Sequence, residues 1–262
     1  MDSKIAKRAY ITWVALLLGV SSLAAQSDVV AIPKHLAIAR ELVDNIKSED
    51  NQYSLGGQSI GFPGDLFSSR YSMRADCSGF LLAVFDRAKY STQSEMVFLN
   101  SAARRRRPAA EDFVHSIETE KGFRQIKRVS EMMPGDLLAH AMLKTEDQQK
   151  TGTTGHIFLI NSVPTPIEPK KPIVEGTHQF LVSVIDSNEE HVGDDDTRLV
   201  DPSNKVKGLG KGSIRVYVDA NDALVGWART FKNASRFFSY STQFPSDSKA
   251  RKAAIGRPTT GQ

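Results

Sequence analysis

Hydrophobic residues recur every three or four positions in the first half of the chain, which is the spacing of one helix face. This pattern predicts a helix over 33–47, with an apolar stripe formed by Leu36, Ala39, Leu42, Val43 and Ile46. A mostly apolar run predicts a second, buried helix that begins at Cys77 and ends near residues 89–90. A third, shorter helix is predicted over 109–121.

The pattern changes after residue 121, where short apolar or alternating segments are separated by turn residues. They predict strands at 122–126, 137–139, 155–160, 178–187, 213–218, 223–227 and 237–244. Helices followed by a run of strands are typical of an α+β fold, with the helices packed on one side of a curled antiparallel β-sheet. The glycine-rich segment 53–73 is predicted to be a loop, and the polar, basic tail 245–262 is expected to be disordered.

The N-terminus resembles a signal peptide over residues 1–25. Lys4, Lys7 and Arg8 precede an apolar stretch of about a dozen residues, too short for a comfortable membrane span, and small residues follow it. An uncleaved N-terminal anchor is the alternative. We therefore expect an exported protein, periplasmic or extracellular, with one domain over 29–244. The single cysteine excludes an internal disulfide, and an odd thiol in an exported protein indicates an intermolecular bridge or a reactive group.

Charge argues against a nucleic-acid partner, because the formal net charge is +4 and residues 1–25 account for about half of it. The run Arg104-Arg105-Arg106-Arg107 is the strongest local charge. It is either a solvated loop or a contact for an anionic envelope polymer. We expect a monomer.

Cys77 has the local context of a nucleophile. Asp76 can cap the helix that begins at Cys77, by accepting hydrogen bonds from the free N–H groups of its first turn. A thiol at that position feels the positive end of the helix dipole, which favours the nucleophilic thiolate. Ser78 and Gly79 are small and leave room for a substrate. The alternative is an inert, buried core cysteine.

A cysteine nucleophile needs a base and a group that orients the base. Of the six histidines, His35, His115 and His191 are expected at the surface, while His140 and His178 lie at strand ends. His156 differs because it opens the most apolar strand. Asp186 ends the next apolar strand and could accept the second ring N–H of His156. The alternatives are a hydrogen-bonded core histidine for His156 and a turn residue for Asp186.

Three short motifs give the chain a resemblance to a known family. Asp-Cys-Ser-Gly-Phe at 76–80, Pro-Gly-Asp-Leu at 134–137 and Gly-His-Ile at 155–157 follow the order seen in the NlpC-type bacterial cell-wall peptidases. The stretch 53–57 resembles a further family motif, with Leu55 in place of a tryptophan. The resemblance covers residues 53–187, and its intervals between motifs are longer than is usual in the family.

The resemblance implies a papain-like fold and an exported cysteine hydrolase that cleaves an amide bond in peptidoglycan stem peptides through a thioester. Cys77 would match the nucleophile and His156 the base, and Asp186 would take the third position. Tyr53 would border the nucleophile and help to hold the oxyanion, next to Asp76 and Ser78. No metal or organic cofactor is expected. Two alternatives remain: a non-catalytic envelope-binding module with the same fold, and an acyltransferase or amidase that acts on a non-wall substrate.

Overall fold

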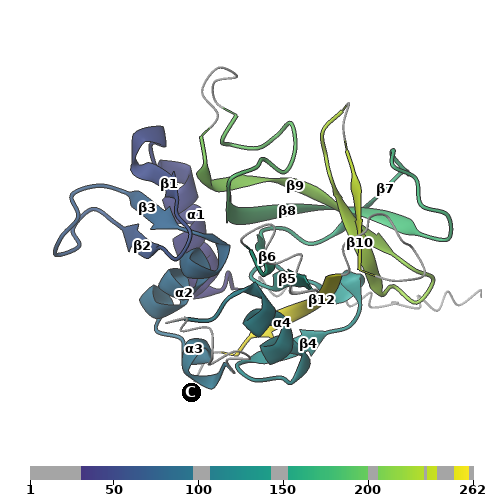
Figure 1. The fold of residues 1–262 in the computed structure, drawn as a ribbon, viewed down its shortest axis with the longest axis horizontal. Helices are drawn as coiled ribbons and strands as arrows, with labels where there is room; N and C mark the ends of the chain where they lie inside the picture. The colour runs from purple at the N-terminus through teal and green to yellow at the C-terminus, as the bar shows by residue number, and fades with distance from the viewer. Residues whose placement is uncertain are drawn as a thin grey trace, which may run out of the picture. The chain divides into compact units, whose positions relative to one another are not determined.

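The two longest strands pair along their whole length. β8 (His178–Asn188) and β9 (Gly208–Val218) are antiparallel, from His178 opposite Val218 to Asn188 opposite Gly208. They belong to a nine-stranded antiparallel sheet with the order β11-β10-β9-β8-β6-β5-β12-β4, and β7 also pairs with β8 (Figure 1). The computed structural model describes residues 31–96, 107–142, 153–199, 206–232, 235–240 and 251–259, and all of them except Ala31 belong to one compact unit, Ile32–Gln262.

The middle strands of this sheet are buried on both faces. Leu137 and Ile157 pack with the helices, whereas Leu138 and Phe158 pack in a second core with Trp227. Continuous apolar runs are what such strands require. The other strands of the sheet are β4 (Phe123–Ile126), β5 (Leu137–Met142), β6 (Gly155–Ile160), β7 (Thr165–Ile167), β10 (Leu224–Arg229), β11 (Phe237–Ser239) and β12 (Arg251–Pro258).

A second, three-stranded sheet lies in the stretch that was predicted to be a loop. It consists of β1 (Asn51–Tyr53), β2 (Gln58–Gly61) and β3 (Ser72–Ala75), in the order β1-β3-β2. The loop prediction is therefore wrong where these strands fall inside it, at Tyr53, 58–61 and 72–73. Gly56, Gly57 and Gly64 lie in the connections between the strands, whereas Gly61 ends β2.

The three predicted helices are present, as α1 (Lys34–Asn45), α2 (Cys77–Ala88) and α4 (Ala110–Glu118), together with a short α3 (Thr92–Glu95). The 3₁₀ turns Ser48–Asp50 and Val129–Glu131 complete the helical elements of the described residues. α2 packs against β2 and β3 of the small sheet and against β6 and β8 of the large one (Figure 1). Its first residue consequently lies where the two sheets meet. No helix among the described residues is long and apolar enough to cross a membrane.

The predicted fold class, papain-like α+β with N-terminal helices on a curled sheet, is wrong. Strands hold 37% of the described residues and helices 23%, and the arrangement is not that of helices packed on a sheet in the papain manner. The physical reason is that the large sheet buries both of its faces, and its second core is built from strand residues such as Val182, Val216 and Trp227.

The expectation of a disordered tail is also wrong over 251–258. These residues form β12, which pairs with β5 on one side and β4 on the other, so its backbone groups are bonded in both directions. Ile255 is buried, and Gly256 lies so close to Ile117 that a Cβ there would be 2.5 Å from a side-chain carbon. The predicted signal peptide over 1–25 and the tail residues 245–250 and 260–262 lie outside the described residues.

Candidate active site

Cys77 is the first residue of α2, directly after the cap residue. Asp76 has an extended backbone, and its Oδ1 accepts hydrogen bonds from the Gly79 backbone N–H at 2.9 Å and from the Ser78 hydroxyl at 3.0 Å. Its Oδ2 accepts from the Gly56 backbone N–H at 2.9 Å. The predicted N-cap is confirmed. The same carboxylate ties the turn after β1 to the start of the helix.

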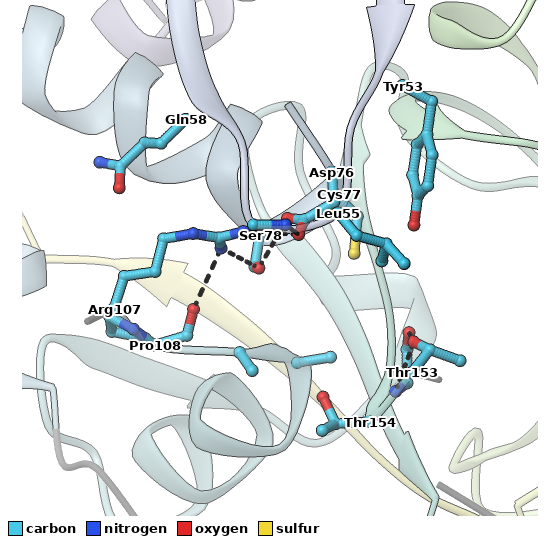
Figure 2. A pocket seen from close by; sticks show the side chains of 14 residues that line it. Tyr53, Leu55, Gln58, Asp76, Cys77, Ser78, Arg107, Pro108, Thr153 and Thr154 are labelled. Carbon is cyan, nitrogen blue, oxygen red and sulfur yellow. Dashed lines mark hydrogen bonds and ion pairs between the residues drawn. The ribbon is translucent and has the colours of Figure 1, made fainter. Parts of the chain in front are cut away.

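The turn between β1 and β2 crosses the first turn of α2 at very short range. A Cβ on Gly79 would lie 1.9 Å from the carbonyl oxygen of Gly57, and a Cβ on Gly57 would lie 2.6 Å from the carbonyl oxygen of Arg74. Glycine is therefore required at both positions for the backbones to approach. The approach places Tyr53 and Leu55 at the mouth of the site around Cys77 (Figure 2).

The structure brings His156 and Asp186 together from adjacent strands. β6 and β8 run antiparallel, with Leu159 opposite Ile185, so the start of β6 lies beside the end of β8. The His156 Nε2–H group donates to Asp186 Oδ2 at 2.8 Å, and the ring packs edge-on against Phe158 with 4.6 Å between centroids. These contacts hold the imidazole in one orientation.

The same imidazole interacts with Cys77, so the three predicted triad residues meet. Burial lowers the pKa of His156, but the negative charge of Cys77 and the hydrogen bonds to Asp186 and Cys77 outweigh burial and raise that pKa to about 9. Because Nε2 is engaged with Asp186, Nδ1 is the ring nitrogen that remains available to Cys77. At neutral pH the ring is therefore a cation, hydrogen-bonded to the buried carboxylate of Asp186.

Asp186 is held from behind by a buried ion network that was not predicted. Arg198 is 2% exposed, and its Nη2 donates to Asp186 Oδ1 at 2.9 Å and to Asp196 Oδ2 at 2.6 Å. Burial raises the pKa of Asp186, but the charge of Arg198 and the hydrogen bond from His156 bring it below its usual range. In the sequence three consecutive aspartates and Thr197 precede Arg198, a polar pattern that is typical of a solvated loop.

A cavity of about 660 Å³ opens onto the sulfur of Cys77 (Figure 2). Figure 2 shows the Tyr53 side chain and the Cys77 sulfur projecting in the same direction, toward Thr153 and Thr154. Burial, followed by the charges of Cys77 and Asp76, raises the pKa of the Tyr53 hydroxyl, which therefore stays protonated and able to donate a hydrogen bond. The cavity thus combines a sulfur, a hydroxyl donor and room for a substrate.

Arg107, the last residue of the arginine run, forms part of this cavity. Its Nη2 forms an ion pair with Asp76 Oδ2, and its Nη1 donates to the Ser78 hydroxyl at 2.6 Å (Figure 2). Arg107 therefore neutralises the carboxylate that caps α2 and is not a solvated side chain. Arg104, Arg105 and Arg106 lie outside the described residues, and the predicted contact with an anionic polymer stays a prediction.

Comparison with known proteins gives the chain a relative from a giant virus. It is 31% identical over 213 residues to the uncharacterized protein R653 of Acanthamoeba polyphaga mimivirus, a match that covers 78% of this chain and 91% of the viral protein. The chain belongs to the R653 family. No protein-family model and no solved structure matches it.

The remaining histidines of this R653-family protein fill other roles. His140 lies opposite His156 on β5, with 6.1 Å between the ring centroids, and burial lowers its pKa well below the usual value, so it stays neutral. His35 is buried and donates from Nε2 to the Gly135 carbonyl at 2.7 Å, and His191 is also buried, so their predicted surface positions are wrong. Within the described ranges, no three His, Cys, Asp or Glu residues are grouped to hold a metal ion.

Proposed function

We propose that this R653-family protein is a cysteine hydrolase that cleaves an amide bond through Cys77, His156 and Asp186. One observation carries the proposal: an imidazole that is hydrogen-bonded to a buried carboxylate also feels the charge of the sulfur at the start of α2, beside an open cavity. A nucleophile, a base within reach and a group that orients the base are the requirements of covalent acyl chemistry. The adjoining cavity gives a substrate access to the sulfur.

The reaction follows from the positions of these groups. The thiolate of Cys77 attacks the carbonyl carbon of the amide, and the oxyanion that forms is bound by the Cys77 backbone N–H and the Tyr53 hydroxyl. The C–N bond then breaks, and the protonated Nδ1 of His156 gives its proton to the leaving amine, which leaves a thioester. Neutral His156 next takes a proton from water, the hydroxide attacks the thioester, and the carboxylic acid leaves with the thiolate restored.

Peptidoglycan stem peptides are the substrate we propose first. Two features of the sequence favour them: the resemblance of three ordered motifs to the NlpC-type peptidases and an N-terminus that resembles a signal for export. The same three residues would also support acyl transfer or amide hydrolysis on a substrate outside the cell wall.

Thiol alkylation tests the mechanism without any assumption about the substrate. The chain has one cysteine, so the label that iodoacetamide adds is unambiguous. We expect the folded protein to react at pH 6, where an ordinary thiol of pKa about 8.5 reacts little. His156→Gln should abolish this reactivity, whereas His178→Gln, at an exposed position, should retain it. Labelling that occurs only in denaturant would contradict the proposal and favour a non-catalytic binding module.

Purified sacculi test the substrate. Incubation with the protein should release soluble muropeptide fragments, and Cys77→Ala should abolish their release. If the alkylation result is positive but no fragments appear, the wall substrate is wrong and the cysteine chemistry stands. Equal release by Cys77→Ala would remove this cysteine from the mechanism.

A further inference from the structure

We infer that Arg198 is a positioning residue of the proposed active site: it holds Asp186 as an anion with Oδ2 directed at His156, and Asp196 holds Arg198 in that place. This inference rests on the proposed function, because it concerns the residues behind the same triad. It adds two residues that do not touch a substrate. Neither belongs to the motifs that pointed to the cysteine chemistry.

The two carboxylate oxygens of Asp186 have different partners. Oδ1 accepts from Arg198 at 2.9 Å, which leaves Oδ2 for the His156 ring at 2.8 Å, with Asn188 Nδ2 also donating to Oδ2 at 3.2 Å. A carboxylate fixed at both oxygens cannot rotate about its Cβ–Cγ bond. The orientation of the imidazole toward Cys77 is therefore set by Arg198 through Asp186.

The guanidinium of Arg198 has its own binding place. Its Nε and Nη2 form a fork with both oxygens of Asp196, at 2.8 and 2.6 Å, and its Nη1 donates to the Gly208 carbonyl at 2.9 Å. Gly210 lies beneath it, because a Cβ there would be 2.2 Å from Nε of Arg198. Asp196 is held in turn by the Val192 backbone N–H at 2.9 Å. These contacts lie inside the protein, so the role of Arg198 is to hold the neighbouring groups in place.

The positive charge of Arg198 explains why an arginine is needed behind Asp186. Asp186 is 1% exposed, and a buried carboxylate without a cation takes up a proton rather than remain ionised. A protonated Asp186 would no longer stabilise the His156 cation. The charge of Arg198 is the strongest of the influences that keep the pKa of Asp186 low.

The other charged or titratable groups around the network lie on four elements. Cys77 on α2 and neutral His140 on β5 face His156, and Arg229 on β10 also feels the charge of Asp186. Arg251 on β12 faces His140. Arg198 differs from both of these arginines because it donates directly to Asp186.

The experiment compares the pH dependence of Cys77 alkylation in the full chain and in four variants. Arg198→Met should lower the rate at pH 6 by about tenfold or more, as expected for a change of one pH unit or more in the pKa of the imidazole. It should also raise the pH at which alkylation reaches half of its maximal rate above that of the wild type. Arg215→Met is the matched control, since Arg215 is equally buried but donates only to the backbone carbonyls of Lys171 and Arg229.

Two further variants separate orientation from charge. Arg198→Lys keeps a cation but has no fork, so we expect the half-maximal pH of alkylation to be restored and the maximal rate to stay low. Arg198→Met combined with Asp196→Asn keeps the net charge of the network, and we expect it to stay as slow as Arg198→Met. These comparisons also serve if Arg198→Met alone does not fold, because each makes its own prediction.

The outcomes are distinct. A wild-type pH profile in folded Arg198→Met, or a wild-type rate in Arg198→Lys or in the double variant, overturns the inference and leaves the proposed function intact. A loss of the low-pH reactivity in Arg215→Met as well would show that any buried arginine has this effect, and would equally overturn it. Absence of low-pH reactivity in the wild type would overturn both proposals together.

Discussion

Replacing Cys77 with serine should lower the pKa of His156 from about 9. The wild-type value lies about 2.5 pH units above the ordinary histidine value of 6.5, which corresponds to about 3 kcal/mol in favour of the imidazolium. Among the influences that raise it, the charge of Cys77 is the strongest, and the hydrogen bond to Cys77 acts in the same direction. A serine hydroxyl carries no charge at these pH values, so we expect a fall of at least about one unit, or about 1.4 kcal/mol.

Heteronuclear NMR of histidine-labelled protein between pH 5 and 10.5 measures this value directly. His178 and His115 lie outside the site, so their signals should be the same in both proteins, which provides an internal control. The buried His140 should remain neutral throughout. A His156 pKa in Cys77→Ser within a few tenths of the wild-type value would refute the sulfur–imidazole ion pair, and with it the reasoning that makes Cys77 a nucleophile.

Three other predictions concern the site and its support. Asp186→Asn removes interactions that raise the pKa of His156. The upper pH limit of hydrolysis, expected near pH 9 in the wild type, should therefore move down, and an unchanged limit would contradict this role. Gly79→Ala places a Cβ 1.9 Å from the Gly57 carbonyl oxygen, so the strand turn must move; calorimetry should show a loss of about 1–3 kcal/mol and alkylation should slow. Ending the chain before Arg251–Pro258 removes a strand between two others, so soluble protein should be lost, whereas removing only 260–262 should have no effect on yield.

Local pattern was sufficient for the helices and for most strands of the large sheet. The apolar stripe predicted α1, and the Asp-Cys-Ser-Gly sequence predicted both the cap and the start of α2. Strand β6 and the end of β8 were also recognised, which placed His156 and Asp186 on elements that are neighbours in the sheet. These features depend on residues within about ten positions of each other, where periodicity and capping rules apply.

The same rules could not predict how whole strands and helices pack together. β12 has little apolar character, and its place in the sheet depends on backbone pairing with β5 and β4, which are more than a hundred residues earlier in the chain. The small sheet could not be predicted either, because its strands are only three or four residues long in a glycine-rich stretch. The predicted fold class failed for a related reason: α+β followed from the order of elements and papain-like from the resemblance of short motifs, and neither describes how the strands build the second core.

The buried charged residues around the triad could not be identified from local sequence patterns. Arginine and aspartate are almost never buried unless they are paired, so nothing in the local sequence singled out Arg198 or Asp196, and a solvated loop was one of two interpretations of the run that contains Arg107. Each is instead paired with a residue of the active site or its support: Arg198 with Asp186, and Arg107 with Asp76. The motif residues carry the proposed chemistry, but Arg198 keeps the pKa of Asp186 low beside it, and Arg107 pairs with the carboxylate that caps α2. The pH range of the reaction should therefore depend on residues that no short motif contains, which is why the variants of Arg198 test the site more severely than another substitution of Cys77 would.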